Sequence, residues 1–173
     1  MTVIQLQPLM AHDTEIGDVV ELYKMIWGAE SGFCARLQKH SGYHGFIGHT
    51  AKTADGEMAG FVYGYCSLPG MYYRKLMEAA LTSDEIAYWL DDCYEFVELG
   101  VRPKHQGNGI GTMLHDRLLQ EATCKTAILS TQYSNVRARC LYERLGWVCI
   151  SESFFPASPG PRYILMGNRL REG

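Results

Sequence analysis

A glycine-rich run at residues 105–112 is the part of the sequence best suited to binding a ligand. Glycines occupy alternate positions there, at Gly107, Gly109 and Gly111. Apolar residues then recur every four positions, as in a helix that starts near residues 108–109, at Ile110, Leu114 and Leu118. The first backbone N–H groups of a helix have no partner within it and carry the positive end of its dipole. Glycine lets a ligand come close to these groups, so the run predicts a cradle for a diphosphate.

The spacing of the glycines argues against two common nucleotide-binding motifs. A Walker A loop needs a lysine directly after its glycines, and the sequence has none at that position. The dinucleotide fingerprint needs G-x-G-x-x-G, whereas this run is G-x-G-x-G, and the next predicted strand ends in Thr131 and Gln132 rather than in an acidic residue. A strand-to-helix turn without a ligand also uses glycines, so the run alone leaves that alternative open.

Composition and charge limit the class of protein. The chain has 173 residues, of which 47% are hydrophobic and 20% charged, and a net charge of -3. That length suits one domain with its own core, and the charge offers no basic field for nucleic acid or for an anionic membrane. The N-terminus lacks the pattern of a signal peptide, and no stretch approaches the ~20 apolar residues of a membrane-spanning helix. We therefore expect a cytoplasmic protein that binds neither nucleic acid nor membrane.

Histidines and cysteines form no recognised metal-binding pattern. His40 and His44 have a spacing that lets them share a helix face, but no cysteine or glutamate completes a set, so we expect no metal. None of the six cysteines belongs to a C-x-x-C pair. Four of them lie in or beside apolar runs and are expected to be reduced core residues, namely Cys66, Cys93, Cys124 and Cys149. His115 is expected on an exposed helix face.

The order of the predicted elements favours an α/β domain with a mixed sheet. Alternation and apolar runs predict strands at residues 2–9, 45–53, 55–67, 93–101, 125–132, 147–151 and 162–170. Helical spacing predicts helices at about 13–27, 32–40, 71–90, 109–122 and 135–146. Local signals add an N-cap at Asp13 or Thr14, a hairpin turn at residues 54–56, a break at residues 83–84 and a C-cap at Gly146.

Two motifs together resemble the signatures of the GNAT superfamily, the acyl-CoA-dependent N-acyltransferases. The run from Gln106 to Gly111 matches Q/R-x-x-G-x-G/A and follows Val101, the strand-end valine position of that family. Downstream, "NVRARCLYERLGW" is similar to N-x-x-A-x-x-x-Y-x-x-x-G-F/W, with the matching residues Asn135, Ala138, Tyr142, Gly146 and Trp147. The resemblance implies a single GNAT-type domain over residues 1–173, with a mixed central sheet of about seven strands, a splayed central strand pair and flanking helices.

The resemblance also implies that acetyl-CoA is the co-substrate, and it assigns residues to parts of that molecule. The pyrophosphate is expected on the backbone amides of Gln106, Gly107, Asn108, Gly109, Ile110, Gly111 and Thr112, with the Thr112 hydroxyl as a further donor. The pantetheine arm is expected to pair with backbone groups of Leu99, Gly100 and Val101, as a strand would. Asn135 is expected to touch that arm or to hold the loop before its helix.

Transfer of an acyl group to an amine needs a base for the ammonium, donors for the oxyanion and an acid for the leaving thiolate. The resemblance makes Tyr142 the acid near the coenzyme sulfur, and a tyrosine packed on the core is a compatible alternative. It favours Glu98 as the base, followed by Glu95, although an amine that arrives neutral or loses its proton to water needs neither. Strand alternation puts these glutamates on opposite faces, unless a bulge near residue 99 changes the parity.

The acceptor is expected to be a primary amine of a small molecule or a peptide, and its identity stays open. Residues 68–92 are long for a connection, so we interpret them as a helical insertion that lines the acceptor pocket. A helix packed on the sheet is the alternative. Members of the family often form homodimers, and the sequence leaves the oligomeric state open.

Three functions are therefore compared. The first is a catalytic N-acetyltransferase, which Tyr142 and the strand glutamates favour. The second is a non-catalytic acyl-CoA-binding regulatory module on the same fold. The third is a phosphate-binding domain for another nucleotide, against which the glycine spacing argues.

Overall fold

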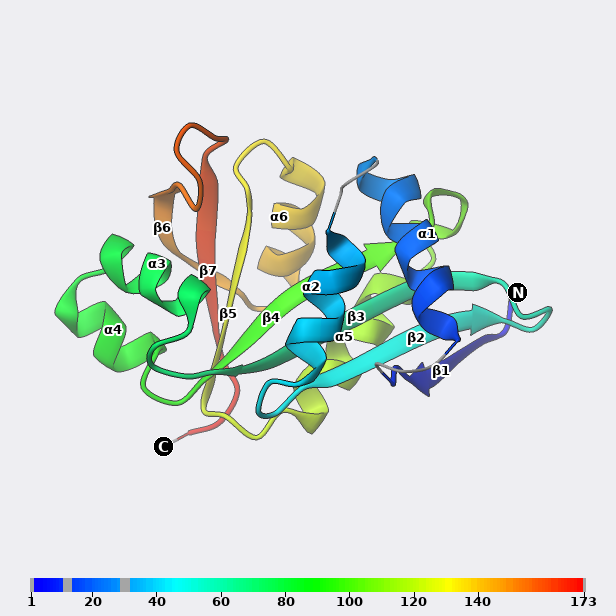
Figure 1. Ribbon diagram of the computed structural model, residues 1–173, viewed down its shortest axis with the longest axis horizontal. Coiled ribbons are helices and arrows are strands. Elements are labelled where there is room, and N and C mark those ends of the chain that lie inside the picture. The colour runs from blue at the N-terminus through cyan, green and yellow to red at the C-terminus, as the bar shows by residue number, and fades with distance from the viewer. Residues whose placement is uncertain (1, 11–13, 29–31, 173) are drawn as a thin grey trace. The chain divides into compact units, whose positions relative to one another are not determined.

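Figure 1 shows the chain as a computed structural model, which describes residues 2–10, 14–28 and 32–172. The described strands form one seven-stranded mixed sheet in the order β1-β2-β3-β4-β5-β7-β6. The strands are β1 (Ile4–Pro8), β2 (Ile47–Thr53), β3 (Met58–Ser67), β4 (Cys93–Val101), β5 (Thr126–Gln132), β6 (Val148–Phe154) and β7 (Tyr163–Arg169). The helices are α1 (Glu15–Trp27), α2 (Phe33–Ser41), α3 (Tyr72–Ala80), α4 (Ser83–Trp89), α5 (Ile110–Glu121) and α6 (Val136–Arg144). The predicted α/β class with a mixed sheet of about seven strands is confirmed.

The helical segments differ from the predicted ones in two places, and one of the two predicted N-caps of α1 is confirmed. The break in the 71–90 segment falls at residues 81–82, because Thr82 caps α4 and exchanges hydrogen bonds with Glu85 in a capping box. A short 3-10 turn, η1 (Pro103–His105), follows β4 and had no periodicity by which to predict it. Thr14 is the N-cap residue of α1, but its side chain makes no capping bond to a described residue, and Asp13 lies outside the described residues.

The strand pairing combines hairpins with one parallel crossover. β1 pairs with β2, and β2 with β3, in antiparallel fashion, and the hairpin turn uses Gly56 at a φ of 89°. The parallel pairing of β4 with β5 covers Cys93–Glu95 against Thr126–Ile128. β7 then lies between β5 and β6 and is antiparallel to both. The splay of the central pair that the resemblance implies stays a prediction.

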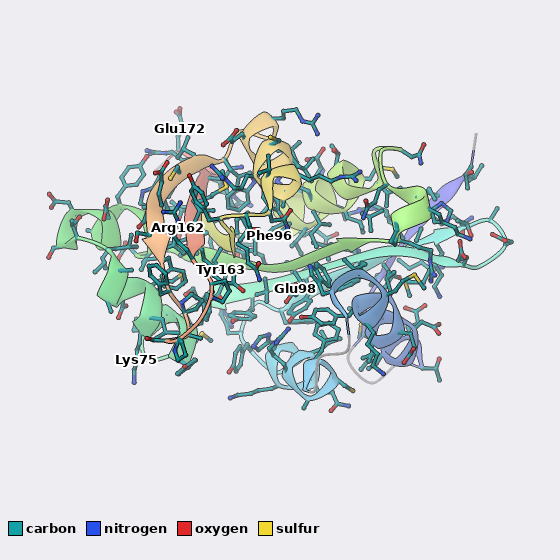
Figure 2. All side chains as sticks on the ribbon, turned by 90° about the horizontal axis from the view of Figure 1, so that it is seen from above. Lys75, Phe96, Glu98, Arg162, Tyr163 and Glu172 are labelled. Carbon is teal, nitrogen blue, oxygen red and sulfur yellow. The ribbon has the colours of Figure 1, made fainter. Side chains whose placement is uncertain are left out.

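The described residues group into two compact units, of which the first comprises Met1–Tyr65 and Val97–Ala122. Within it, α1 and α2 lie on one side of β2 and β3, and α5 lies on the other (Figure 2). Its apolar core joins α1, α2 and β3 through Leu9, Val19, Leu22, Tyr23, Phe33, Leu37, Met58, Phe61 and Tyr63. Phe61 and Tyr63 of β3 point into this core, whereas a Cβ at Gly60 would point at Leu114 of α5, on the other face of the strand.

The second unit comprises Cys66–Phe96 and Thr123–Gly173. Its core packs α3 and α4 on β5, β6 and β7 through Met77, Leu90, Cys93, Ile128, Phe154 and Leu165. The Tyr73 hydroxyl lies 2.6 Å from the Ser130 hydroxyl on β5. Residues 68–92 therefore supply part of this unit's core, whatever else they do.

Two expectations about burial were wrong. His115 is 4% exposed rather than on an open helix face, because the apolar stripe of α5 is wide enough to include the position beside Leu114. Cys149 is exposed, because β6 is the edge strand of the sheet. Cys66, Cys93 and Cys124 are buried free thiols, as predicted.

No helix in the described part of the chain has both the length and the apolar character needed to cross a membrane.

We predict that Gly60→Ala lowers the free energy of unfolding by about 1–3 kcal/mol, the usual cost of overpacking. Its Cβ would lie 2.8 Å from the Gly100 carbonyl oxygen and 2.9 Å from Leu114 Cδ1. The matched control is Gly17→Ala in α1, where a Cβ meets nothing within 4 Å. That change should raise stability by about 0.5–1 kcal/mol, because alanine is the better helix former. Urea unfolding measures both, and a Gly60→Ala protein as stable as wild type would contradict the packing.

Candidate functional site

The loop between β4 and α5 ends in two glycines with left-handed backbone. Gly107 and Gly109 both have a φ of 80°, and Gly109 is the N-cap residue of α5. No side chain of the described residues caps the first N–H groups of α5. The N–H of Gln106 already donates to the Pro103 carbonyl, at 3.2 Å. The backbone N–H groups that remain for a ligand therefore begin at Gly107.

Side chains of the loop brace its own backbone. Gln106 Nε2 donates to the Val101 carbonyl at 3.1 Å, which ties the loop to the end of β4. Asn108 Nδ2 donates to the His105 carbonyl at 3.1 Å. These bonds fix the path of the chain at the point where it enters the helix, so the N–H groups there are preorganised for an anion.

Glu57, at the start of β3, connects the hairpin to this loop. Its carboxylate lies 2.7 Å from Lys104 Nζ and 2.6 Å from His105 Nε2. Hydrogen bonds from Lys104 and His105 lower the pKa of Glu57 to about 2. Arg102 donates from Nε to the Met58 carbonyl at 2.7 Å. Glu57 thus holds Lys104 and His105 beside the start of β3, and Asp55 also interacts with the charge of Lys104.

The end of β4 departs from simple alternation. Val97 packs against the core of the first unit, and a Cβ at Gly100 would also point into it, 2.8 Å from Phe61 Cε1. Two positions with an odd separation cannot share a face in a regular strand, so the alternation breaks between them, as at a β-bulge. Gly100 is a glycine because Phe61 and Ile26 occupy the space that a side chain would need.

Glu98 is held in an ion pair with a helix distant in sequence. Arg36 of α2 places Nη2 3.2 Å from Glu98 Oε1 and 3.3 Å from the Tyr23 hydroxyl. The two side chains are 33% and 20% exposed, so the pair is partly open to solvent. Figure 2 labels Glu98, which points from β4 toward α2. No local pattern in the sequence indicates a role for Arg36, because its partner is 62 residues away.

His40, considered above as a metal ligand, belongs to an aromatic cluster. Its Nδ1 lies 3.1 Å from the Tyr63 hydroxyl, and its ring lies against Tyr43 and Tyr65. Burial, followed by the charges of Arg36 and Lys39, lowers the pKa of His40 to about 4. The imidazole is therefore neutral at pH 7. Among residues 2–10, 14–28 and 32–172, no group of three or more His, Cys, Asp or Glu side chains is placed to hold a metal ion.

Tyr142, Asn135 and Glu95 lie in the second unit. The Tyr142 ring is 7% exposed and packs edge-on against Phe96 and Trp147, so the core-packing interpretation holds for the ring. Asn135 caps α6, because its side chain accepts from the Ala138 N–H at 3.2 Å. Glu95 is 5% exposed and lies in the part of β4 that pairs with β5.

The chain belongs to the acetyltransferase (GNAT) family, whose pattern it matches over residues 18–147. That range includes the glycine loop, the end of β4 and the whole of α6. The family resemblance drawn from the two sequence motifs is therefore confirmed.

Individual relatives agree with this assignment. A GCN5-like protein acetyltransferase of Mycobacterium tuberculosis is 30% identical over 128 residues, which are 69% of this chain and 62% of that protein. The match thus spans less than two thirds of that relative's length. The ribosomal-protein-S18-alanine N-acetyltransferase of Escherichia coli superimposes with a TM-score of 0.72 at 18% identity and covers 99% of this chain and 96% of its own. Arabidopsis thaliana NAA60, solved with acetyl-CoA, gives a TM-score of 0.71 at 15% identity over 96% and 98% of the two chains. At these identities the two structures show a shared fold.

We predict that the stability of the wild-type protein falls between pH 6.5 and 4 partly because of His40. Its folded pKa is lowered from 6.5 to about 4, so in this window the unfolded chain binds a proton that the folded chain does not. Stability therefore rises with pH across the window, and His40→Gln removes that part of the slope. Urea unfolding at several pH values measures it. In NMR titrations the His40 ring signals should change with a midpoint near pH 4, and a midpoint near 6.5 would contradict the burial.

Proposed function

We propose that the chain transfers an acetyl group from acetyl-CoA to a primary amine of a small molecule or a peptide, by direct attack in a ternary complex. The observation that carries the proposal is the start of α5, where left-handed glycines precede N–H groups that no described side chain caps. This arrangement follows β4 directly, as the first family motif requires. Backbone donors and a helix dipole favour the diphosphate of coenzyme A.

The residues of the first unit suggest how the coenzyme is bound. Gly107 to Thr112 would hold the pyrophosphate, whereas Gln106 would act by bracing the loop, because its N–H is already used. Lys104 and Arg102 add positive charge next to the same loop. Leu99 to Val101 would pair with the pantetheine arm, and the break in alternation before Gly100 supports backbone groups that are free of regular pairing.

Tyr142 is proposed as the acid that protonates the leaving thiolate. Its ring is buried between Phe96 and Trp147, which restrains the direction of the hydroxyl. A restrained donor loses little entropy when it acts, and general acids contribute typically 10²–10⁴-fold to a rate. Asn135 is proposed to act by capping α6, the helix that carries Tyr142.

Glu98 is proposed as the base that takes the proton of the acceptor ammonium. Its carboxylate is 20% exposed and ion-paired, so it is ionised and reachable at neutral pH. Glu95 is the second candidate, but at 5% exposed it is less accessible to an acceptor. A cytoplasmic location and a homodimer are further proposals, which cell fractionation and sedimentation would test.

Thiol release from acetyl-CoA with a panel of amines and peptides tests the catalytic proposal. Acceptor-dependent release supports an N-acetyltransferase. Tight binding of acetyl-CoA without release for any acceptor would instead favour the non-catalytic acyl-CoA-binding module. Stronger thermal stabilisation by ATP or NAD than by acetyl-CoA would favour a different nucleotide.

We predict that Gly109→Ala weakens acetyl-CoA binding at least roughly tenfold, because a left-handed residue with a Cβ is strained by about 1–2 kcal/mol and shifts the loop. Gly70→Ala is the matched control, since Gly70 also has a positive φ, 91°, and open space around a Cβ. Isothermal titration calorimetry measures the affinity and urea unfolding the stability. Equal affinity in the two variants would argue against a coenzyme site at this loop.

We predict that Tyr142→Phe lowers kcat by about 10²–10⁴-fold, because the thiolate then leaves without an acid. The affinity for acetyl-CoA should change little, since the ring and its packing remain. Tyr163→Phe, at a tyrosine of β7 that packs against the core of the same unit and has no assigned role, is the control and should keep wild-type kcat. A Tyr142→Phe enzyme with full turnover would rule out the role assigned to the hydroxyl.

A further inference from the structure

The Arg36–Glu98 ion pair has features of a binding site as well as of a structural contact. Nη2 and Oε1 are 3.2 Å apart, and both side chains keep exposed surface, 33% and 20%. A partly exposed ion pair contributes only about 0–1 kcal/mol to stability, so stability alone gives little reason for this one. This pair is reachable from solvent, and one member is the proposed base.

The guanidinium of Arg36 is held by groups other than Glu98. It lies 5.8 Å from the ring centroid of Tyr23 and 5.4 Å from that of Phe33, and these rings stack on each other at 3.8 Å. Nη2 also donates to the Tyr23 hydroxyl at 3.3 Å. Arg36 therefore keeps its position if a ligand takes over its bond with Glu98. Preorganised guanidinium groups bind carboxylates well, because their donors match two carboxylate oxygens.

The described titratable groups near the pair lie on α2, β4, α1 and β3. On α2, Arg36 lies one turn before Lys39 and His40. Burial, followed by the charges of Arg36 and Lys39, lowers the pKa of His40 to about 4. His40 is therefore neutral at pH 7. On β4, Glu98 carries the opposing charge, and Tyr23 of α1 and Tyr63 of β3 are neutral phenols. Burial and Glu98 raise the pKa of Tyr63.

We propose that the acceptor is a free α-amino acid, with its carboxylate bound by Arg36 and its ammonium by Glu98. An α-amino acid carries both charges on one carbon, so they are as close together as the two members of this ion pair. Each charge of the ligand would meet its opposite on the protein. This inference depends on the proposed acetyl transfer and names its substrate class.

The reaction balances with the groups already assigned. Glu98 takes a proton from the ammonium, and the amine nitrogen attacks the thioester carbonyl carbon. The N–C bond forms, the C–S bond breaks, and the thiolate takes the proton of Tyr142. The second proton of the attacking nitrogen passes through water to the tyrosinate, which restores Tyr142, and Glu98 releases its proton to solvent. The products are an N-acetylamino acid and coenzyme A. Arg36 touches only the carboxylate, so it sets specificity and is not part of the proton transfers.

The test compares amino acids with the amines that lack only the carboxylate. The pairs are phenylalanine and phenethylamine, tyrosine and tyramine, histidine and histamine, and leucine and isoamylamine, with alanyl peptides as a third arm. Wild type should prefer the acid in at least one pair by roughly 10- to 100-fold in kcat/KM, the usual value of a charge-assisted hydrogen bond. Arg36→Met should reduce this ratio to about one, and Arg36→Lys should restore part of it. The ratio within one preparation does not depend on how much of the variant is folded.

Arg117→Met is the matched control, because it removes an arginine of α5 that is 47% exposed and lies 3.8 Å from Glu121. It should keep the wild-type ratio. Calorimetry with the same amino acids and amines, added to protein saturated with coenzyme A, gives a readout that needs no turnover. Preferential binding of the acid that Arg36→Met abolishes would support the inference even if acetyl transfer failed.

Three results would overturn the inference while leaving acetyl transfer intact. Wild type could turn over peptides or plain amines and no free amino acid. It could also treat acid and amine alike in every pair. Finally, Arg36→Met could lower both rates equally, which would make Arg36 a structural residue only. If neither calorimetry nor turnover detects a free amino acid, the inference is wrong whatever the state of the catalytic proposal.

Discussion

The unfilled hydrogen bonds at the start of α5 are the constraint on which the rest of the site depends. A helix leaves its first N–H groups without partners, and here left-handed glycines stand where a capping side chain would. The helix cannot move away, because Leu114 and Leu118 are fully buried. The loop cannot relax, because Glu57 holds its basic side chains and Gln106 holds its backbone. Packing therefore holds these N–H groups in place, and the proposed diphosphate would satisfy them.

Close packing also determines the structure at the end of β4. Gly60 and Gly100 let β3, β4 and α5 approach so closely that a methyl group would meet backbone or core atoms. In the same unit, Glu98 lies beside the guanidinium of Arg36, which also donates to the Tyr23 hydroxyl. The carboxylate lies beside a cation, and the pair stays partly open to solvent, which the proposed role of Glu98 requires.

Much of the fold was predictable, because periodicity and turn residues are local properties. β4 was predicted at its observed bounds, and Gly109 was expected at the start of α5. The wrong predictions concern the burial of side chains. His115 was placed on an open face, and Cys149 in the core, because the sequence shows neither the width of a buried stripe nor which strand lies at an edge. Both depend on neighbours distant along the chain.

The sequence by itself determined the family and the element order, since both follow from residue types at short spacings, and it predicted the glycine-rich anion site. Only the tertiary structure decided that Gln106 braces the loop instead of offering its N–H, and that Asn135 caps α6. It alone brought Arg36 to Glu98, across 62 residues of chain. The reason is physical: local propensity depends on neighbours in sequence, whereas ion pairing and burial depend on neighbours in space.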